Sequence, residues 1–497
     1  MTFNIKPQNI LNDNEINTGL RYLLLDGIFS QSMGSLATGA FLIAFALSLG
    51  ATNFLIGIIA AIPFLANLSQ IFVTGLIEKL RMRKIISVCA STISRIALLF
   101  LALTPFIFGD SKLIALTIFV IMFSLFGAIS NAAFNSWMRD FVPQDIRGRY
   151  FAKRTRFSLL IGTVLSIFAA GYVDNFIKLS FLSVDPKYSL LFAIAFILGL
   201  VGIVFLVQIP EPQIYSNGHF SIGDLKLPFK DKRFRKLLTF IFIWSFGYSM
   251  VFPFFIVYML TRLGLSILFV IGITAFSQLI TVSLLPIWGQ LIDKYGIKPV
   301  MRTSALFFLS GLLLWPYTTL PERYILTIPF LFVIYLLLGF ASGGISLSST
   351  IFSYKLSPEN KSVSYITSYG TIASLSAGVA PIVGGLLTEI FMKMHLSLDF
   401  NWEDALNPIT IILTDFKGLD FLFAAGFFIG LYSLYILKDV SENGSAPYSV
   451  VRAEFFYSIK RYIRAQFPLT SNIRLRASPS KNTKIKKEKR RLTLQVV

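Results

Sequence analysis

The sequence contains a single cysteine and only two histidines among its 497 residues. Cys89 lies inside an apolar run and has no cysteine partner in the chain, which excludes an intrachain disulfide and a cysteine-bound metal cluster. His219 and His395 fall between apolar runs, and no glycine-rich phosphate loop precedes a helix. The sequence therefore predicts no enzyme active site, no metal site and no bound cofactor.

Acidic residues are also scarce. Only 25 Asp and Glu residues accompany 45 Lys and Arg residues, so the formal net charge is +20. A charge of this size can indicate binding to nucleic acid, but its distribution indicates a membrane instead. Most cations fall on one side of the topology described below, and many lie in residues 439–497. We therefore expect no nucleic-acid partner.

Apolar residues, in contrast, are abundant. They make up 55% of the chain, which contains 50 phenylalanines and has a mean hydropathy of +0.70. A soluble core could not bury this much apolar surface, so the composition predicts an integral membrane protein. Twelve apolar runs have the length of a membrane-spanning helix. They cover residues 20–49, 54–77, 85–108, 113–138, 157–173, 188–209, 237–260, 265–292, 300–318, 324–352, 364–390 and 421–437.

The Lys and Arg residues orient these spans. If the N-terminus is cytoplasmic, the even-numbered loops contain the basic clusters and the odd-numbered loops contain only scattered cations. We therefore expect a multi-pass protein of the cell inner (plasma) membrane with both termini in the cytoplasm. The polar segments divide the chain into a first bundle (1–209), a cytoplasmic linker (210–236), a second bundle (237–438) and a basic tail (439–497).

A short motif separates two of the runs. Residues Gly289 to Val300, GQLIDKYGIKPV, place a glycine, an acid and basic residues at fixed intervals. The spacing resembles the loop signature of the major facilitator superfamily, which is G-x-x-x-D-[RK]-x-G-x-[RK]. A second copy, LIEKLRMRKI at Leu76 to Ile85, lies about 215 residues upstream. In that copy Arg81 stands in the place of Gly296, so the turn glycine is missing.

A second pair of segments aligns at the same offset. RDFVPQDIRGRYFAKR at Arg139 to Arg154 matches YKLSPENKSVSYITS at Tyr354 to Ser368, which places Pro143 on Pro358. The chain is thus predicted to be a tandem repeat. The resemblance, which covers about residues 20–438, implies an all-α integral membrane fold with twelve transmembrane helices in two six-helix pseudo-symmetric bundles. It also implies a substrate path between the halves near mid-bilayer. We expect a monomer.

The resemblance further implies that the charged loop residues control which way the cavity faces. In the family, the acids that end helices two and eight contact the N-terminal ends of helices eleven and five of the opposite half. Unpaired N–H groups and the helix dipole there stabilise a carboxylate by about 0.3–1 kcal/mol. The alternative is that these charges only stop helices at the headgroups and anchor the topology. The candidates are Glu78, Lys79, Arg83, Arg139, Asp140, Arg147, Gly289, Asp293, Lys294, Gly296 and Lys298.

Two ionisable residues, Asp26 and Arg95, lie within apolar runs. A charge at the bilayer centre costs several kcal/mol, so neither should face lipid. Both are candidates for coupling. Asp26 is the candidate site of protonation or counter-charge, since the first helix lines the substrate path in the family. Alternatively it is a static partner of Arg21 or Arg95. For Arg95 the alternative is a structural contact, because third helices in the family support the cavity helices without lining them.

The remaining candidates are polar or aromatic side chains on the helices that line the cavity in the family, the first, fourth, seventh and tenth. Their alternative role is hydrogen bonding between helices. A cavity so lined would be nearly uncharged, which favours a neutral or weakly charged, partly apolar small molecule as substrate. The candidates are Ser30, Gln31, Asn131, Asn135, Trp244, Tyr248 and Ser346.

No substrate subclass is supported. GVAPIVGG at Gly378 to Gly385 resembles the bend signature of drug antiporters, but that signature belongs in helix five and this copy falls in helix eleven. We interpret its Pro381 as a kink. The sugar-porter signature PESPR after helix six is replaced by Pro210-Glu211-Pro212.

The tail has an amphipathic segment. Between Val450 and Phe467, aromatic and aliphatic residues recur at helical spacing, and Lys460, Arg461 and Arg464 lie on the other side. This pattern predicts a helix in the inner-leaflet interface that contacts anionic lipid. The main functional hypothesis is a secondary active transporter of a small organic solute that works by alternating access. The alternative is a non-transporting membrane sensor or anchor of the same fold, whose basic tail binds anionic lipid or a partner.

Overall fold

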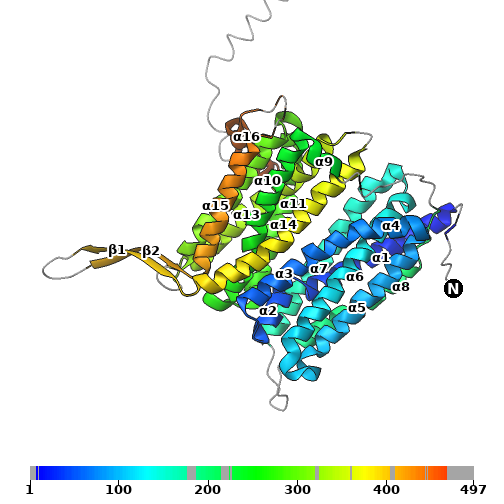
Figure 1. The fold of residues 1–497 in the computed structure, drawn as a ribbon, viewed down its shortest axis with the longest axis horizontal. Coiled ribbons are helices and arrows are strands. Elements are labelled where there is room, and N and C mark those ends of the chain that lie inside the picture. The colour runs from blue at the N-terminus through cyan, green and yellow to red at the C-terminus, as the bar shows by residue number, and fades with distance from the viewer. Residues whose placement is uncertain are drawn as a thin grey trace, which may run out of the picture.

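The computed structural model describes residues 7–8, 11–175, 186–213, 223, 226–319, 324–358, 361–402, 409–440, 442, 444 and 446–466. Within these ranges the chain is helical apart from loops, one β-hairpin and an isolated bridge between Gln8 and Pro212. Twelve helical segments are long and apolar enough to cross a membrane. The predicted all-α membrane fold is therefore confirmed, and Figure 1 shows its two bundles side by side.

The N-terminal bundle contains the first six spans. The first span is broken at Gly39, whose φ of 64° favours glycine. The second span is interrupted by a short 3₁₀ turn. The elements are α1 (Asp13–Ala37), α2 (Ala40–Ser48), α3 (Asn53–Ala66), η1 (Asn67–Ser69), α4 (Gln70–Leu80), α5 (Arg83–Ile107), η2 (Gly109–Ser111), α6 (Lys112–Phe141), α7 (Gln144–Asn175) and α8 (Lys187–Val207).

The C-terminal bundle contains the other six spans, preceded by one short helix and followed by the tail helix. A two-stranded antiparallel hairpin separates its last two spans. The elements are α9 (Leu227–Lys230), α10 (Lys232–Val257), η4 (Tyr258–Arg262), α11 (Ile267–Tyr295), α12 (Ile297–Leu314), η5 (Trp315–Thr318), α13 (Thr327–Lys355), α14 (Ser362–Phe391), β1 (His395–Trp402), β2 (Ile409–Lys417), α15 (Leu419–Leu437) and α16 (Tyr448–Gln466).

Several helices continue beyond the apolar runs. The fifth run begins at Phe157, but α7 begins at Gln144, directly after Pro143. Most of the segment from Arg139 to Arg154, which the repeat alignment treats as a loop, is therefore helical. Hydropathy detects only the part of a helix that lies in hydrocarbon, and polar side chains extend it into the headgroup region. One of them, Tyr150, packs back on the bundle and donates a hydrogen bond of 2.6 Å to the carbonyl of Leu20.

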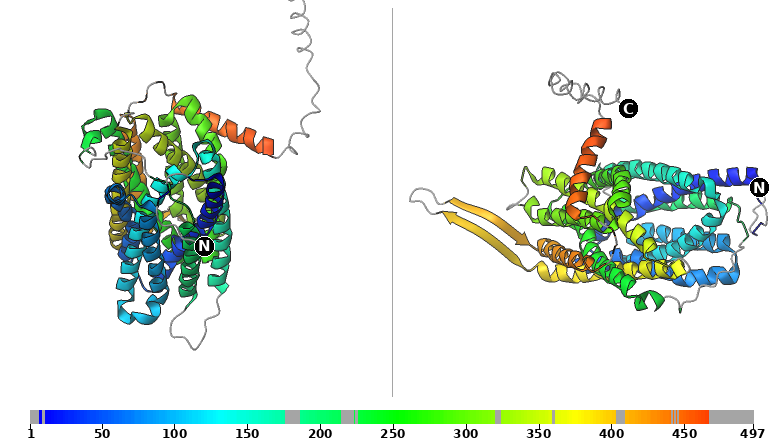
Figure 2. Two further views of the ribbon diagram at one scale, coloured as in Figure 1. Left: turned by 90° about the vertical axis from the view of Figure 1, so that its right-hand side faces the viewer. Right: turned by 90° about the horizontal axis from the view of Figure 1, so that it is seen from above.

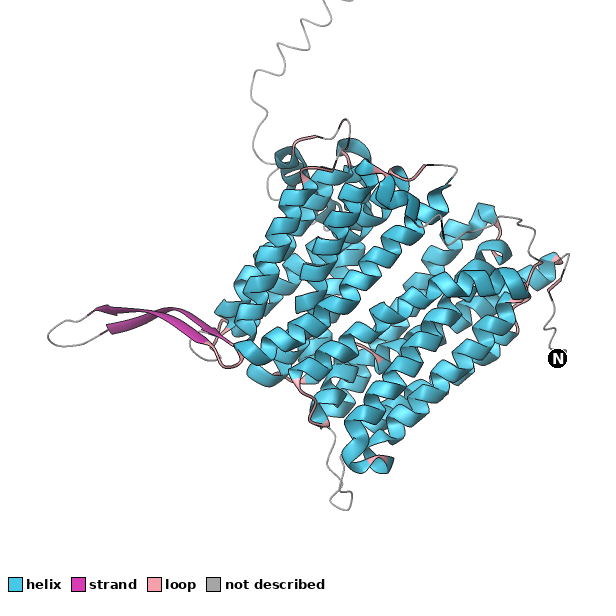
Figure 3. Cartoon of the chain, in the orientation of Figure 1, coloured by secondary structure: helices cyan, strands magenta, loops and turns pink. Residues whose placement is uncertain are grey.

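The hairpin was not anticipated from the sequence, which suggested only a loop between the last two spans. Figure 3 shows it projecting away from the bundle. His395 pairs with Lys417 at its base. There the Asp415 carboxylate bonds His395 Nε2 at 2.6 Å and accepts a hydrogen bond from Lys417 Nζ at 2.7 Å. Burial would raise the pKa of Asp415, but the hydrogen bonds and positive charge of these two partners outweigh burial and lower it.

The two bundles pack together near this hairpin. We call that side of the molecule the hairpin end and the opposite side, with the α4–α5 turn and α9, the linker end. At the hairpin end α3 lies against α14 (Figure 1). A Cβ on Gly57 would lie 2.2 Å from the carbonyl oxygen of Pro381, and one on Gly385 would lie 2.6 Å from that of Asn53. Glycine is therefore required for the close approach of the two helices.

The tail helix α16 lies crosswise at the linker end of the C-terminal bundle (Figure 2). The Phe455 ring stacks on Trp288, with 4.1 Å between centroids, and both Phe455 and Val451 are fully buried. Part of the face that the sequence assigns to lipid is thus covered by α11. Phe456 and Tyr457 remain more than half exposed. The side chains of Tyr462, Ile463 and Phe467 lie outside the described residues.

Candidate functional site

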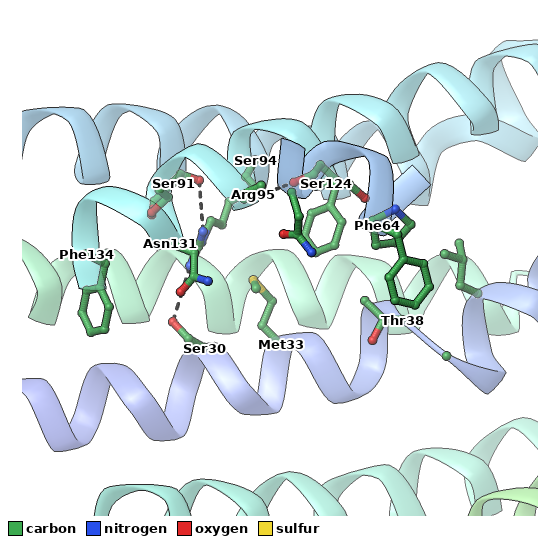
Figure 4. A pocket seen from close by; sticks show the side chains of 18 of the residues that line it. Ser30, Met33, Thr38, Phe64, Ser91, Ser94, Arg95, Ser124, Asn131 and Phe134 are labelled. Carbon is green, nitrogen blue, oxygen red and sulfur yellow. Dashed lines mark hydrogen bonds between the residues drawn. The ribbon is translucent and has the colours of Figure 1, made fainter. Parts of the chain in front are cut away.

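A cavity of about 690 Å³ lies between the bundles. Most of its lining comes from α1, α3, α5, α6 and α7 of the N-terminal bundle, and Phe252, Pro253 and Ile256 of α10 close its other side. Thr38 and Gly39, at the break in the first span, also line it. Figure 4 shows polar side chains from α1, α5 and α6 converging on one part of this cavity. Three of the lining side chains, Asp26, Arg95 and Arg154, are ionisable, and charges cost more to bury than neutral polar groups.

Asp26 of α1 is buried and forms an ion pair with Arg154 of α7, with 3.2 Å between Oδ2 and Nη2. Its other oxygen accepts a hydrogen bond from Ser30 at 3.2 Å. Arg154 also donates to the carbonyl of Leu23 at 3.1 Å. A Cβ on Gly27 would lie 2.5 Å from Arg154 Nε, so this glycine makes room for the arginine. Asp26 therefore has a partner that neither sequence-based alternative named.

Arg95 of α5 lines the same cavity and is only 7% exposed. The side chain of Arg95 packs against Gly199 of α8, where an added Cβ would lie 2.6 Å from Arg95 Cγ. The guanidinium donates to the carbonyl of Ser91 and to Ser30 Oγ, both at 3.4 Å (Figure 4). Its Nε has no hydrogen-bond partner among the described residues. The third span thus contributes directly to the cavity, unlike the supporting role that the family resemblance implied.

A group of serines continues the polar lining along α5 and α6. Ser91 and Ser130 are 2.6 Å apart at their hydroxyl oxygens, and Ser87 lies 3.2 Å from Ser130. Ser94 donates to the carbonyl of Phe123 at 2.9 Å. These contacts join two adjacent helices and leave hydroxyls at the cavity wall. No sequence pattern distinguishes these serines as cavity residues, because isolated serines in apolar helices usually serve helix packing.

Three of the predicted cavity residues line this space. They are Ser30, Asn131 and Asn135. Asn135 Nδ2 donates to Asn131 Oδ1 at 3.4 Å, as expected for side chains four residues apart on one helix face. Their amides lie on α6 opposite Arg95 and Ser30, so the structure brings these groups together in one site.

The other four predicted cavity residues do not line it. Trp244 and Tyr248 pack in the aromatic core of the C-terminal bundle, 5.6 and 5.0 Å from Phe308 between ring centroids. Gln31, one position after Ser30, turns toward α7, where a Cβ on Gly162 would lie 3.2 Å from its Cγ. Ser346 is exposed on α13. Helix rotation of about 100° per residue separates Gln31 from Ser30.

Arg83, from the first motif copy, is buried inside the N-terminal bundle. It forms an ion pair with Asp140 and donates to the carbonyls of Ser136 at 3.0 Å and Pro212 at 2.8 Å. Glu211 accepts hydrogen bonds from the backbone N–H groups of Arg83 at 2.7 Å and Lys84 at 3.2 Å. Glu211 therefore caps the N-terminus of α5 and is buried, although the sequence suggested a solvated linker there.

The second bundle repeats this arrangement with Glu442, which follows the last span. Its carboxylate accepts hydrogen bonds from the N–H groups of Ile297 at 3.0 Å and Lys298 at 2.7 Å, and from Lys355 Nζ at 2.9 Å. Burial would raise the pKa of Glu442, but these donors lower it. Lys298 Nζ in turn donates to the carbonyls of Lys438 and Val440. Lys298 thus contributes to a junction within one bundle.

The turns of the two motif copies share one backbone requirement. Gly296 has φ 97° and its N–H donates to Ile292 at 2.9 Å. Arg81, at the corresponding place, has φ 50° and donates to Ile77 at 2.8 Å. Arg81 thus adopts a left-handed conformation that costs a side chain roughly 1–2 kcal/mol. Gly289 lies within α11, and a Cβ there would meet Leu347 at an ordinary 3.9 Å.

The other loop charges lie at the linker end. Asp293 is exposed and, within the described ranges, forms no hydrogen bond or ion pair. Lys79 and Lys294 are exposed, and Lys294 Nζ lies 4.9 Å above the ring of Tyr295. For Glu78 only the backbone is described.

Arg139 and Arg147 hold the turn between α6 and α7. Arg139 Nε lies 3.2 Å from Asp140 Oδ1. Arg147 Nη2 donates to the carbonyls of Arg139 at 2.5 Å and Val142 at 3.1 Å. Each of these contacts lies within the N-terminal bundle.

Two acids cross between the bundles at the hairpin end. Asp174, near the end of α7, accepts hydrogen bonds from the N–H groups of Ile267 at 3.0 Å and Leu268 at 2.7 Å, at the start of α11. Glu389, near the end of α14, accepts one from the N–H of Phe54 at 3.2 Å, at the start of α3. Each carboxylate therefore caps a helix of the opposite bundle.

Comparison with known proteins places this geometry in context. A family model described as the Major Facilitator Superfamily matches residues 25–381 and 273–445. A crystal structure of a mutant of the nucleoside transporter NupG is 13% identical, covers 85% of this chain and 100% of its own, and has a TM-score of 0.65. The crystal structure of a D-xylose-proton symporter is 15% identical, covers 87% of this chain and 99% of its own, and has a TM-score of 0.63.

A third solved structure, a bacterial homologue of the iron transporter ferroportin in an inward-facing state, is 14% identical. It covers 87% of this chain and 100% of its own, with a TM-score of 0.61. No curated protein sequence matches this chain. At such low identities the structural likeness establishes the shared fold and does not identify a substrate.

Proposed function

Because this chain belongs to the Major Facilitator Superfamily, we propose that it is a secondary active transporter that moves a small organic solute by alternating access. Twelve spans make it a multi-pass membrane protein. The cavity between the bundles supports the proposal, since charged and polar side chains line a space between the two halves. Both termini are proposed to be cytoplasmic, in the cell inner membrane. The linker end is then the cytoplasmic side.

The observation that carries the proposal is the pair of carboxylate caps at the hairpin end. Asp174 and Glu389 join opposite bundles through helix N-termini, and these contacts are possible only while that end is closed. At the linker end, Asp293 has no partner within the described ranges. This combination supports a molecule that is closed outside and open inside. A second state follows if the caps separate and the motif acids engage instead.

Asp26 is the proposed coupling residue. Its ion pair with Arg154 depends on a charged carboxylate at the cavity wall, and Ser30 donates a hydrogen bond to the other carboxylate oxygen. Protonation would remove the charge that holds Arg154, so a proton entering the site would change the contacts between α1 and α7. A static role remains the alternative, in which the pair only satisfies two buried charges.

The proposal is tested on the full chain. The purified protein is screened by thermal shift against a metabolite and drug library, since a bound ligand stabilises the folded state. Compounds that bind are then offered to proteoliposomes with and without a proton gradient. Saturable uptake by proteoliposomes, absent from protein-free vesicles, is expected. Binding without any uptake or exchange would contradict the transporter proposal.

The alternative function, a sensor or lipid-binding anchor, rests on α16. This helix is docked on α11 through Phe455 and still exposes Phe456 and Tyr457 to the surroundings. Removal of residues 448–497 distinguishes the two functions. A transporter is expected to keep uptake after this truncation, whereas a sensor would lose its response while the membrane-spanning part stays folded.

A further inference from the structure

The charges at the cavity wall do not balance. Three ionisable side chains line it, Asp26, Arg95 and Arg154, and the described lining contains no second acid. Asp26 lies in direct contact with Arg154 at 3.2 Å. Arg95 reaches Asp26 only through Ser30, by contacts of 3.4 and 3.2 Å. The wall therefore has one positive charge in excess, and it is carried by Arg95.

The guanidinium of Arg95 is also poorly satisfied. It has five N–H donors, yet its two hydrogen bonds within the described residues are both 3.4 Å long, and its Nε has no partner there. Arg95 is only 7% exposed, and a buried cation with no counter-ion in direct contact is unfavourable. An anion that entered the cavity would offset this cost. The site should therefore bind an anionic ligand, because the described lining contains no second acid to pair with Arg95.

We infer that the cavity takes a small organic monocarboxylate whose carboxylate binds Arg95 and whose apolar body lies toward α10; this inference rests on the proposed transport function. A planar carboxylate matches the fork of a guanidinium. Asn131 lies beside Arg95, and its side-chain amide supplies a neutral donor (Figure 4). One excess charge suits a monoanion better than a phosphate dianion.

The rest of the lining defines the body of the ligand. About half of the lining residues have apolar side chains. Such a surface binds a ring or a short alkyl chain and disfavours further charged groups. The apolar lining residues include Met33, Leu42, Ile43, Phe64, Phe252 and Ile256.

Matched pairs of compounds test this assignment. Purified full-length protein is screened by thermal shift with a library in which each monocarboxylate, such as benzoate or hexanoate, is paired with its primary amide. Carboxylates are expected to stabilise the protein and their amides are not. In Arg95→Gln the carboxylate affinity should fall by about tenfold or more, because a desolvated charge partner is lost. Arg302→Gln is the control, since Arg302 stacks on Tyr448 outside the cavity.

A second variant is expected to bind carboxylates more tightly, which a misfolded protein could not do. Asp26→Asn raises the excess charge of the wall from one to two, so it should strengthen carboxylate binding while leaving the amides without effect. Unchanged carboxylate affinity in Arg95→Gln, or a library in which amides bind as well as carboxylates, would overturn the assignment. If amides or other neutral solutes are taken up by proteoliposomes, transport stands and the substrate class is wrong. If carboxylates bind at Arg95 but are not transported across the membrane, the transport proposal fails and the assignment of a carboxylate site at Arg95 still holds.

Discussion

Asp174 and Glu389 lie about 215 residues apart and occupy equivalent places in the two bundles. Asp174 caps α11 from the end of α7, and Glu389 caps α3 from the end of α14. The offset equals that of the repeated loop motifs. The two halves of the tandem repeat thus contain equivalent contacts, and both cross the interface between the bundles at the hairpin end.

Removing these carboxylates should open the hairpin end. Asp174→Asn and Glu389→Gln each lose a charge at a helix N-terminus, so each should shift the equilibrium away from the closed arrangement by about 0.5–1 kcal/mol, roughly two- to fivefold. The double variant should shift it further. Spin-label distances across the hairpin end measure the effect. Asp110→Asn, an exposed acid at the same end, is the control, and equal distance distributions in all variants would refute a gating role.

The motif acids should act in the opposite direction. Asp293→Asn and Glu78→Gln are expected to shift the protein toward the arrangement with the linker end open, because they remove contacts specific to a closed linker end. The expected size is again about 0.3–1 kcal/mol for each residue. Labels placed across the linker end report the change. If neither substitution alters those distances, the acids serve only to end their helices.

The turn at Arg81 should be improved by glycine. Arg81→Gly removes the penalty of a left-handed side-chain residue, and we expect the free energy of unfolding to rise by about 1 kcal/mol. Arg81→Ala is the matched variant, since it removes the same charge and keeps the strained backbone. Thermal unfolding in detergent measures both. A glycine variant no more stable than the alanine variant would show that the turn carries no strain.

Glu442 should make stability dependent on pH. Its folded-state pKa lies below the ordinary value of 4.5, so its contribution is present at neutral pH and is lost as the pH falls through the lowered value. Glu442→Gln should cost about 1 kcal/mol at pH 7 and progressively less in acid. Melting temperatures at pH 7 and pH 4 provide the comparison. Asp439→Asn, an exposed neighbour, should show no such difference; a constant gap for Glu442→Gln would contradict the assignment.

Asp26 should be required for accumulation. Asp26→Asn removes the charge that pairs with Arg154, and we expect it to abolish gradient-driven uptake while sparing exchange of substrate across the membrane. Proteoliposomes with and without an imposed pH gradient separate the two activities. Asp13→Asn, on the exposed start of α1, should behave as wild type. Continued accumulation by the Asp26 variant with unaltered pH dependence would assign coupling to another group.

The spans and the repeat could be predicted from the sequence because they depend on local composition. Roughly 20 apolar residues cross a bilayer whatever they later pack against. The glycine turn at Gly296 was predictable for the same reason, because a tight turn that requires a positive φ usually has glycine at that position. Asp26 and Arg95 stood out because a charge within an apolar run is rare.

The partners of these residues depended on tertiary structure. Asp26 pairs with Arg154, 128 positions away, and the sequence placed Arg154 in a loop. Glu211 lies in the predicted linker and Glu442 in the predicted tail, and only the folded chain brings them to the starts of α5 and α12. A carboxylate cap is decided by which helix N-terminus folds against it, and that neighbour is chosen by packing.

The direction in which each helix side chain points could not be predicted from local sequence patterns either. Ser30 lines the cavity and Gln31 turns to α7, although both are polar and adjacent. Composition determined that this chain crosses a membrane twelve times, because transfer of apolar side chains from water to lipid is a property of each segment alone. Only the packed helices decided that the excess charge of the cavity rests on Arg95, because a charge balance depends on groups brought together from α1, α5 and α7.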